Sequence, residues 1–475
     1  METSTLRSVL HTLFPEHQQR MDDMIEEEDD CVPFTAGEVN EAVARFKTRN
    51  KAPGPDGILA KIMGAVHRCD PSALLNLYNT CLRSGSFPRR WKRARVVLLR
   101  KGNKPEGVPS SYRPLCLLND TGKILEFLLA CRLEVHLKTR GDHTPNQYGF
   151  RNERSTDDAI RELDQTILRE KNRGNYCLTV GIDIKNAFNS VRWSDIMEAL
   201  RAWEVPGNMR KIFGSYFSQR SGAVTSHALP GGEYEVNITG GVPQGSVVGP
   251  LLWSTAYNNV LKKELPGGCS MLGFADNTLL VVTSKAIPDL ERLTNRALEQ
   301  IAARIEDLDL QIAVEKTEAL LFTGRYKYAI PEIRLCGTPI KIADQMTYLG
   351  VVIDRSCLFK AYIQNATQKA QQVGARLARL MPNVGGPRET RRRLLTLVVN
   401  SVLLYGAPSW AHTLDIVPSN VKLLNKTPKL SERCSSESQK LGSGLPKKKR
   451  IKHTRLPDKG GMAKKMGQRG DRAMD

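Results

Sequence analysis

The hydrophobic and polar positions of the first third of the chain alternate between helical patterns and short apolar runs. Apolar residues recur three and four positions apart in "SALLNLYNTCLRSG" and "TGKILEFLLACRLEVHLKTR", which predicts two helices. The run "RARVVLLRK" between them is short and rich in β-branched and aliphatic residues, as in a strand. Another helix is predicted to begin at Thr35, because Glu38 follows at the spacing of a capping box, and to end at "NKAPGPDGI", whose prolines and glycines cannot continue it.

From Cys177 onward the pattern becomes strand-like. The runs "CLTVGIDI", "SMLGFA" and "TLLVVTS" are short, apolar and bounded by Gly, Asn or Asp, which predicts strands. A helical segment, "SDIMEALRAWEV", and a Gly- and Pro-rich loop, "ITGGVPQGSVVGPLLW", lie between the first strand and the other two. An amphipathic helix is predicted from Pro288 to about Leu310, then a pair of strands around "EALLFTG" and "MTYLGVVID", then further helix over 360–410. We therefore predict a mixed α/β (α+β) fold without internal repeats.

The two ends of the chain have weaker patterns. Residues 1–30 begin with a weakly amphipathic stretch and close with the acidic run Glu26–Asp30, which predicts a linker or entry segment. Past about Ser431 the apolar periodicity disappears and Ser, Gly, Lys and Arg dominate, which predicts disorder.

Composition limits the class of protein. With 475 residues, of which 40% are hydrophobic, the chain can bury one large core or two or three modest ones. Seventy Lys and Arg against fifty Asp and Glu leave a net charge of +20, which favours a polyanionic partner such as nucleic acid. The last fifty residues hold fifteen basic and five acidic side chains, so they supply half of this excess. A solvated surface with one basic tail is therefore an alternative explanation of the charge.

The cysteines and the apolar runs indicate where the chain resides. Ten cysteines are scattered singly, without a C-x-x-C pair or a zinc-spaced Cys/His cluster, which fits a reducing nuclear or cytoplasmic compartment. The N-terminus lacks the apolar core of a signal peptide, and no run of 18 apolar residues occurs. We expect a protein that is not secreted and has no membrane partner.

Two carboxylates stand at the ends of predicted strands, Asp183 in "VGIDIKNAF" and Asp276 in "LGFADN". A pair of Mg²⁺ ions about 3.5–4 Å apart requires oxygens from rigid carboxylates, and strand ends in one sheet would supply them. Alternatively, Asp276 and Asn277 form only a hairpin tip, and Asp183 caps the next helix. The two residues alone leave both alternatives open.

An ordered series of motifs extends the picture. The segments are "NKAPGPDGI", "WKRARVVLLRKGNKPEGVPSSYRPLCLL", "NQYGFRNERST", "GIDIKNAFNSVRW", "GGVPQGSVVGPLLW" and "GFADN", followed by "VEKTEALLF" and "YLGVVID". In this order and spacing they resemble the reverse transcriptase domain of non-LTR (LINE-type) retrotransposons, most like those of insects, over roughly residues 30–410. The resemblance implies a right-hand polymerase fold with an antiparallel palm sheet. Its predicted parts are a linker (1–30), fingers with the start of the palm (31–175), palm with the catalytic motifs (176–325), end of the palm with a helical thumb remnant (326–410), and a basic, disordered tail (411–475).

The resemblance implies an RNA-directed DNA polymerase that adds deoxynucleotides to a primer 3′-OH with two Mg²⁺ ions, or Mn²⁺ in their place. Asp183 and Asp276 match the metal-binding carboxylates, with help from the backbone carbonyl of Ile184. Asn277 occupies the last position of a catalytic turn that in the family reads Phe-Ala-Asp-Asp. Asn retains an acceptor oxygen but loses the negative charge, so we expect weaker metal attraction. Lys316 matches the lysine proposed to aid departure of pyrophosphate.

Five positions match nucleotide-binding residues of the family. Lys101 and Arg113 correspond to the residues that clamp the triphosphate, as a point charge and a bidentate fork. Phe188 corresponds to the aromatic residue under the sugar, which excludes a 2′-hydroxyl. Gln244 and Gly245 would lie beside the incoming nucleotide, with Gly245 permitting close backbone approach.

The implied partners are an RNA template, a DNA primer and deoxynucleoside triphosphates; no pattern indicates the oligomeric state. Template contacts are predicted for the basic segment Arg89–Arg100 and for "NQYGFR". The run "LPKKKRIKH" matches a nuclear import signal or a nucleic-acid tether. The endonuclease and Cys/His-rich segments of full-length elements have no counterpart in the chain, so we expect a truncated or degenerate copy. The alternative function is a catalytically inactive, nucleic-acid-binding remnant.

Overall fold

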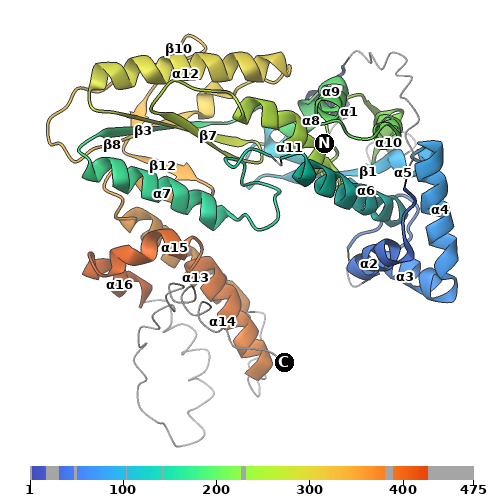
Figure 1. Ribbon diagram of the computed structural model, residues 1–475. Coiled ribbons are helices and arrows are strands. Elements are labelled where there is room, and N and C mark those ends of the chain that lie inside the picture. Colours follow the sequence, from blue (N-terminus) through green and yellow to red (C-terminus); the bar gives the residue numbers. More distant parts are fainter. Residues whose placement is uncertain are drawn as a thin grey trace, which may run out of the picture.

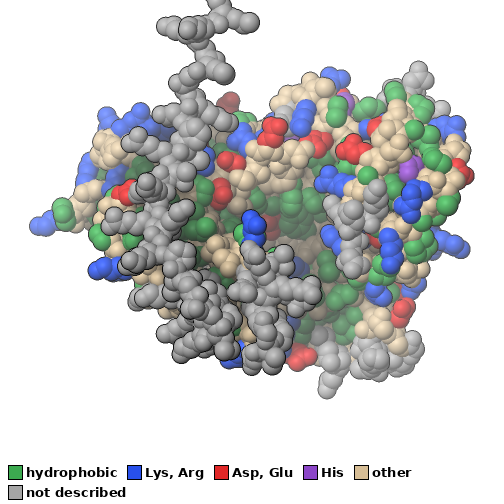
Figure 2. Space-filling model, turned by 90° about the horizontal axis from the view of Figure 1, so that it is seen from below, with side chains coloured by type: hydrophobic (Ala, Val, Ile, Leu, Met, Phe, Trp, Pro, Cys, Tyr) green, Lys and Arg blue, Asp and Glu red, His purple; other side chains and the backbone are tan. Residues whose placement is uncertain are grey.

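Two β-sheets with helices packed on them form the centre of the computed structural model (Figure 1). The structure describes residues 3–17, 32–47, 51–102, 104–141, 143–225, 232–379 and 389–425. Within these ranges helices and strands are mixed along the chain, as predicted. Seen from below, the surface is recessed between the two halves of the molecule, and hydrophobic side chains lie in the recess (Figure 2).

The first sheet has four strands in the order β2-β1-β4-β5. Its strands are β1 (Arg93–Arg100), β2 (Tyr112–Leu117), β4 (Arg220–Thr225) and β5 (Glu233–Ile238). β1 pairs antiparallel with β2 and parallel with β4, which continues into the β4–β5 hairpin. The predicted palm range (176–325) therefore contributes two strands to a sheet that begins in the predicted fingers range (31–175).

Helices from the first half of the chain gather on the right of Figure 1, beside this sheet. They are α2 (Ala36–Lys47), α3 (Ala60–Cys69), α4 (Pro71–Ser84), α5 (Arg89–Lys92) and α6 (Asp120–Thr139). Helix α4 is stopped by Gly85, whose φ of 60° is left-handed, a conformation that glycine adopts without steric cost. The predicted helices over the motifs "SALLNLYNTCLRSG" and "TGKILEFLLACRLEVHLKTR" correspond to α4 and α6 and are confirmed.

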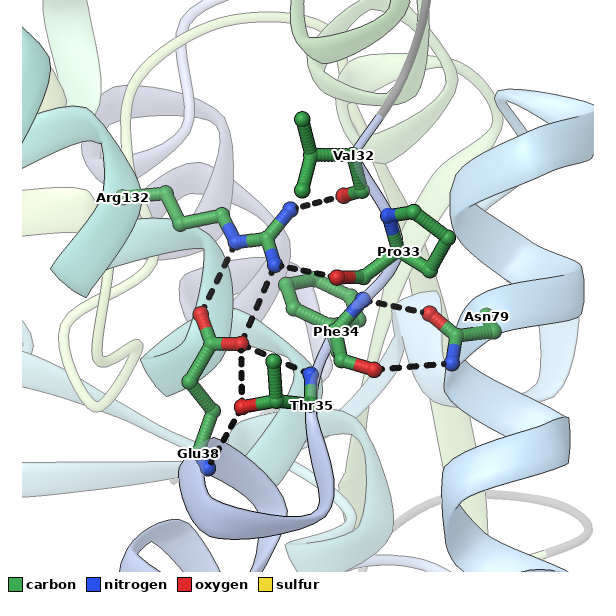
Figure 3. A network of polar contacts seen from close by, with 7 residues as sticks. All are labelled: Val32, Pro33, Phe34, Thr35, Glu38, Asn79 and Arg132. Carbon is green, nitrogen blue, oxygen red and sulfur yellow. Dashed lines mark hydrogen bonds and ion pairs between the residues drawn. The ribbon is translucent and has the colours of Figure 1, made fainter.

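A polar network fixes the start of α2 (Figure 3). Thr35 and Glu38 form the predicted capping box, with Glu38 N–H donating to Thr35 Oγ1 at 3.2 Å and Thr35 N–H donating to Glu38 Oε2 at 2.8 Å. Arg132 of α6 donates to both carboxylate oxygens of Glu38 and to the Val32 and Pro33 carbonyls. Hydrogen bonds from Arg132 lower the pKa of Glu38 to about 2, so this carboxylate is ionised at neutral pH.

The second sheet has five strands in the order β11-β8-β3-β7-β6. Its strands are β3 (Tyr176–Ile182), β6 (Cys269–Phe274), β7 (Asn277–Ser284), β8 (Glu318–Phe322) and β11 (Ile342–Ala343). β3 lies in the middle and pairs antiparallel with β7 and β8. Helix α12 (Ile287–Asp307) covers one face and α7 (Thr156–Asn172) the other (Figure 1), which explains why nearly every residue of β3 is buried.

Further helices lie in the chain between strands of different sheets, as α6 and α7 do: α8 (Ala187–Ser190), α9 (Trp193–Ala202) and α10 (Gly207–Phe217) between β3 and β4, and α11 (Gly249–Leu261) between β5 and β6. The strand predicted around "EALLFTG" is β8 of the large sheet. The segment "MTYLGVVID", predicted as the second strand of the pair, instead forms a separate hairpin of β12 (Gln345–Tyr348) and β13 (Val351–Asp354). A hairpin of β9 (Ile333–Leu335) and β10 (Thr338–Ile340) precedes them.

Helices follow the last hairpin, as predicted for 360–410, and extend below the large sheet in Figure 1. They are α13 (Lys360–Arg379), α14 (Glu389–Leu403), α15 (Ala407–Trp410) and α16 (Pro418–Leu424). Within the described part of the chain no single helix is long and apolar enough to cross a membrane, although the bent pair Arg393–Leu403 and Ala407–Leu414 meets the criteria of length and composition when joined.

The linker predicted for 1–30 is wrong for its first half. Residues Thr3–Leu13 form helix α1, which buries Leu6, Val9, Leu10 and Leu13 in the main core. These four side chains lie three and four positions apart and form one helical stripe, narrow enough to look weak in the sequence. The disordered tail predicted for 411–475 is wrong for its first fifteen residues, because Ala411–Leu414 form a 3-10 turn, Pro418–Leu424 form α16, and Thr413 and Asn420 are buried. The rest of the predicted tail, beyond Asn425, and the acidic run Glu26–Asp30 lie outside the described residues.

Candidate active site

A cleft of about 770 Å³ is lined by both sheets and by α1. All of the sequence-predicted site residues line it: Lys101, Arg113, Asp183, Ile184, Phe188, Gln244, Gly245, Asp276, Asn277 and Lys316. These positions are spread over more than two hundred residues of sequence and are brought together by the folding of the two sheets. The structure thus assembles one candidate site, while the role of each residue stays a prediction.

Asp183 directly follows the central strand β3. Its carbonyl accepts a hydrogen bond from Ala313 N–H at 2.8 Å, and Lys185 N–H donates to Gln311 O at 2.8 Å, so the backbone on both sides of Ile184 is fixed. The next helix, α8, has Asn186 at its N-cap, and no side chain caps it. The alternative that Asp183 caps the next helix is therefore wrong, and its carboxylate points into the cleft instead.

Asp276 lies at the tip of the β6–β7 hairpin. Phe274 and Asn277 form the last pair of the ladder, which leaves Ala275 and Asp276 as the two turn residues. Ala275 has a φ of 58°, a left-handed conformation that costs an alanine about 1 kcal/mol and persists only where the surroundings enforce it. Asp276 is therefore both a hairpin-tip residue and a member of the cleft.

The motif "NQYGFR" enforces this turn. Tyr148 N–H donates to Gly273 O at 2.8 Å, and Gly273 N–H donates to Asn146 O at 2.8 Å, so the motif runs along β6. A Cβ on Gly149 would lie 2.1 Å from the backbone nitrogen of Ala275, so only glycine permits this approach. Half of the motif predicted to bind template thus supports the hairpin that carries Asp276.

Three cations surround the two carboxylates. Lys316 Nζ donates to Asp183 Oδ2 at 2.7 Å, so these two side chains form an ion pair although the lysine is 55% exposed. Burial raises the pKa of Asp276, and the nearby charge of Asp183 raises it further, whereas Arg113 and Lys316 lower it. Burial also lowers the pKa of Lys101, together with the charges of Arg113, Lys104 and Lys316.

Asn277 is exposed beside Asp276, with its Nδ2 3.5 Å from Asp276 Oδ1. No cluster of three or more Asp, Glu, His or Cys side chains with metal-binding geometry occurs among the described residues. Two carboxylates and the Ile184 carbonyl are nevertheless hard oxygen donors of the kind that Mg²⁺ and Mn²⁺ prefer. The donor set fits such an ion, with one negative charge fewer than a three-carboxylate site.

Phe188 forms a hydrophobic wall of the cleft. Its ring centroid lies 5.2 Å from that of Trp253 and 5.8 Å from that of Phe150, and its carbonyl accepts from Val242 N–H at 2.6 Å. Aromatic neighbours on two sides leave the ring little rotational freedom. A ring fixed in this way can act as a steric limit on whatever lies against it.

The Pro-Gln-Gly turn packs on strand β2. Gln244 O accepts from Cys116 N–H at 2.8 Å, and Gly245 has a φ of 132°. A Cβ on Gly245 would lie 2.3 Å from Cys116 O, so any other residue would push the turn away from the sheet. The glycine is therefore required by backbone contact with β2.

Sequence reasoning missed the buried carboxylate that holds this turn. Glu126 of α6 is only 1% exposed and accepts hydrogen bonds from Val247 N–H at 2.6 Å and Ser246 Oγ at 2.7 Å. Its negative charge lies near the N-terminus of α11, where the helix dipole favours it. A glutamate inside the apolar run "KILEFLLA" was the available signal, since a buried charge requires partners.

Sequence reasoning also missed the contribution of α1. Thr12 and Leu13 line the cleft, and Asn186 Nδ2 donates to Leu13 O at 2.9 Å. Asn186 itself has a φ of 50°, a conformation that asparagine tolerates. The last turn of α1 is therefore attached to the segment between Asp183 and Phe188.

The basic segment Arg89–Arg100 is not a continuous free surface. Arg93 pairs with Glu233 at 3.1 Å, Arg95 donates to Pro53 O at 3.2 Å, and Lys92 is only 5% exposed. Arg89 and Arg90 line a second cleft at the other end of β1. The predicted template contacts stay a prediction, with fewer arginines available than the sequence suggests.

The comparisons with known proteins agree with the resemblance seen in the motifs. The family described as "Reverse transcriptase (RNA-dependent DNA polymerase)" matches residues 99–353, more than half of the chain. A "Putative 115 kDa protein in type-1 retrotransposable element R1DM" of Drosophila melanogaster is 31% identical over 421 residues, which are 88% of this chain and 40% of that protein.

Two other relatives have comparable coverage. A "Retrovirus-related Pol polyprotein from type-1 retrotransposable element R1" of Bradysia coprophila is 30% identical over 83% of this chain and 38% of that protein. A "Probable RNA-directed DNA polymerase from transposon BS" of Drosophila melanogaster is 28% identical over 80% of this chain and 42% of that protein. The chain spans about two fifths of the length of the curated relatives it matches.

Proposed function

The chain belongs to the reverse transcriptase family, in the group carried by non-LTR retrotransposons, and from this premise we propose that it is an RNA-directed DNA polymerase. The proposed reaction adds a deoxynucleotide to the 3′-OH of a primer and releases pyrophosphate. The proposed partners are an RNA template, a DNA primer and deoxynucleoside triphosphates.

The observation that carries the proposal is the juxtaposition of Asp183 and Asp276. One follows the central strand β3 and the other stands at the tip of the adjacent β6–β7 hairpin, and both line a cleft that also holds Lys101 and Arg113. Carboxylates and cations that line one cleft are suited to a substrate that combines metal ions with a triphosphate.

Asp183, Asp276 and the Ile184 carbonyl would hold two Mg²⁺ or Mn²⁺ ions. Such ions, when bound, neutralise phosphate charge and lower the pKa of the primer hydroxyl. Lys101 and Arg113 bind phosphate oxygens by charge-assisted hydrogen bonds. Lys316 lies close enough to the carboxylates to supply a proton or a positive charge to departing pyrophosphate.

Phe188 and the turn that contains Gln244 act on the nucleoside. The Phe188 ring, fixed between Phe150 and Trp253, excludes the 2′-hydroxyl of a ribonucleotide sterically. Gln244 and Gly245 line the same cleft and orient the nucleotide beside β2. For the location of the protein we propose the nucleus or the cytoplasm, with "LPKKKRIKH" as an import signal or tether.

A second candidate function is a nucleic-acid-binding remnant without turnover. Asn277 favours it, because the site has two carboxylates against three nearby cations. Salt-sensitive binding of RNA or of an RNA–DNA hybrid without extension is the result that this alternative requires.

Primer extension on an RNA template tests the proposal. The natural full chain, Asp276→Ala and Asn277→Asp are compared with Mg²⁺ and with Mn²⁺ under the same conditions. Extension by the natural chain that disappears in Asp276→Ala supports the polymerase. If neither the natural chain nor Asn277→Asp extends the primer, and both still bind nucleic acid, the polymerase is refuted and the nucleic-acid-binding remnant is supported.

A further inference from the structure

Lys316 forms the shortest direct contact with a carboxylate of the candidate site among the described residues. Its Nζ lies 2.7 Å from Asp183 Oδ2, although the side chains of Lys316 and Asp183 are 55% and 31% exposed. An exposed lysine has many alternative conformations in water, so a backbone that places it beside the carboxylate lowers the entropic cost of this contact.

The backbone provides that direction. Lys316 N–H donates to Ala313 O at 2.9 Å, and Ala313 N–H donates to Asp183 O at 2.8 Å. The helical turn Val314–Lys316 therefore starts from a residue that is bonded to Asp183 itself. These two consecutive hydrogen bonds place the backbone of Lys316 beside Asp183, so that the lysine side chain starts within reach of this carboxylate.

The two carboxylates of the site differ in their partners. Asp183 has the Lys316 ammonium in direct contact, whereas no ion pair to Asp276 occurs within the described ranges. Arg113 and Lys316 influence Asp276 only through space. The Lys316 ammonium thus neutralises Asp183, one of the two carboxylates. Because Asn277 supplies no third carboxylate, this single ion pair offsets half of the negative charge of the two carboxylates.

An ammonium and a divalent cation compete for the same oxygen. A metal ion bound to Asp183 Oδ2 would bring a double positive charge against Nζ, so the lysine has to leave this contact when the ion binds. We propose that Lys316 is an internal competitor for the divalent cation, occupying Asp183 while the site holds no metal. The proposal rests on the proposed function, because it assumes that Asp183 is a metal ligand.

Divalent-cation affinity, measured without nucleic acid or nucleotide, tests the competition. Mn²⁺ is titrated into the full chain at low ionic strength, and free Mn²⁺ is measured by electron paramagnetic resonance. Lys316→Met removes the competing charge and preserves the length of the side chain. Lys316→Arg retains the charge.

Lys185→Met is the matched control. Lys185 lines the same cleft, is 46% exposed, and pairs with Glu315 at 3.6 Å instead of with Asp183. Removing it lowers the positive charge of the cleft by the same amount without freeing Asp183. A general electrostatic effect would therefore appear in both methionine variants, and direct competition only in one.

The expected result is Mn²⁺ binding about tenfold tighter in Lys316→Met, and changed by less than about twofold in Lys185→Met and Lys316→Arg. Adding Asp183→Ala to Lys316→Met should abolish the gain. An equal gain in Lys185→Met, or a gain that survives Asp183→Ala, would overturn the proposal.

Asn277→Asp separates this inference from the proposed function. If Asn277→Asp tightens Mn²⁺ binding and Lys316→Met does not, the competition is refuted while the metal site remains. If neither variant nor the natural chain binds Mn²⁺, both the competition and the proposed metal site are refuted. Tighter binding by Lys316→Met in a chain that extends no primer would uphold the competition and refute only the polymerase.

Discussion

Asp276 combines burial with a neighbouring negative charge, and both raise its pKa. The folded chain then binds this proton more tightly than the unfolded chain, whose carboxyl titrates near 3.8. As the pH rises above the pKa of the unfolded chain, the unfolding free energy falls. Above the pKa of the folded chain, Asp276 is ionised in both states and this loss of unfolding free energy is complete. The metal-free fold is therefore destabilised at neutral pH by the residue on which the site depends.

Replacing Asp276 with Asn should accordingly stabilise the metal-free chain. The gain should be larger at pH 7 than at pH 4, because a growing fraction of the natural carboxyl is protonated as the pH falls through its raised pKa. Urea denaturation in the presence of a chelator, at both pH values, measures the difference. A variant that is less stable than the natural chain at pH 7 would show that the carboxylate contributes favourable contacts instead.

Phe188 should determine the choice of sugar. Phe188→Val removes the ring that packs against Trp253 and Phe150, so a 2′-hydroxyl fits and relative ribonucleotide incorporation should rise roughly 10–200-fold. Phe188→Tyr keeps a ring and should retain discrimination. Single-nucleotide incorporation with matched deoxy- and ribonucleoside triphosphates measures the ratio, and an unchanged ratio in Phe188→Val would remove this residue from the sugar site.

Among single residues, the sequence could predict the site residues that are recognisable from their immediate neighbours in the chain. Asp183 and Asp276 follow apolar runs, and Gly245 lies in a Pro-Gln-Gly turn, so these local patterns predict all three as site residues. The role of Glu126 could not be predicted in this way, because it depends on a hydrogen bond from Val247 N–H, more than a hundred residues away in the chain. Residues that act through a distant backbone leave only indirect signals, such as a charge in an apolar run.

At the level of elements, α1 belongs to the fold and not to a linker. Leu10 is fully buried, and removing its side-chain carbons leaves a cavity in the main core, so Leu10→Ala should cost about 2–5 kcal/mol of unfolding free energy. Ser8→Ala, on the exposed face of the same helix, should change it by less than about 0.5 kcal/mol. Equilibrium denaturation of the full chain gives both values. A loss of unfolding free energy near zero for Leu10→Ala would show that α1 does not contribute to the fold and would support the linker interpretation.

Periodicity predicted most helices and strands correctly, because a buried stripe or a short apolar run is a local property. The pairing of strands was a different matter. β1 pairs with β4, which lies over a hundred residues further along the chain, and no pattern within either strand encodes this partner. The assembly of the cleft from α1, β2, β3 and the β6–β7 hairpin therefore had to come from the structure or from the resemblance.

At the level of the whole molecule, half of the net charge lies beyond Asn425. Nucleic-acid binding that depends on this charge should weaken steeply with salt. Replacing Lys447, Lys448, Lys449 and Arg450 with Gln should reduce the slope of log affinity against log salt for single-stranded RNA by as much as about 3. Filter binding of the full chain over a range of salt concentrations measures the slope; an unchanged slope would exclude this run from RNA binding.

The central claim is that two carboxylates in the cleft suffice for nucleotide addition where Asn277 replaces a third. The most direct test is the single-turnover rate of adding one deoxynucleotide to a primer on an RNA template with Mg²⁺, for the natural chain and for Asn277→Asp. We predict a measurable rate for the natural chain, roughly tenfold to a hundredfold below that of Asn277→Asp, because the added charge strengthens metal binding. Addition by Asn277→Asp with none by the natural chain would contradict the claim.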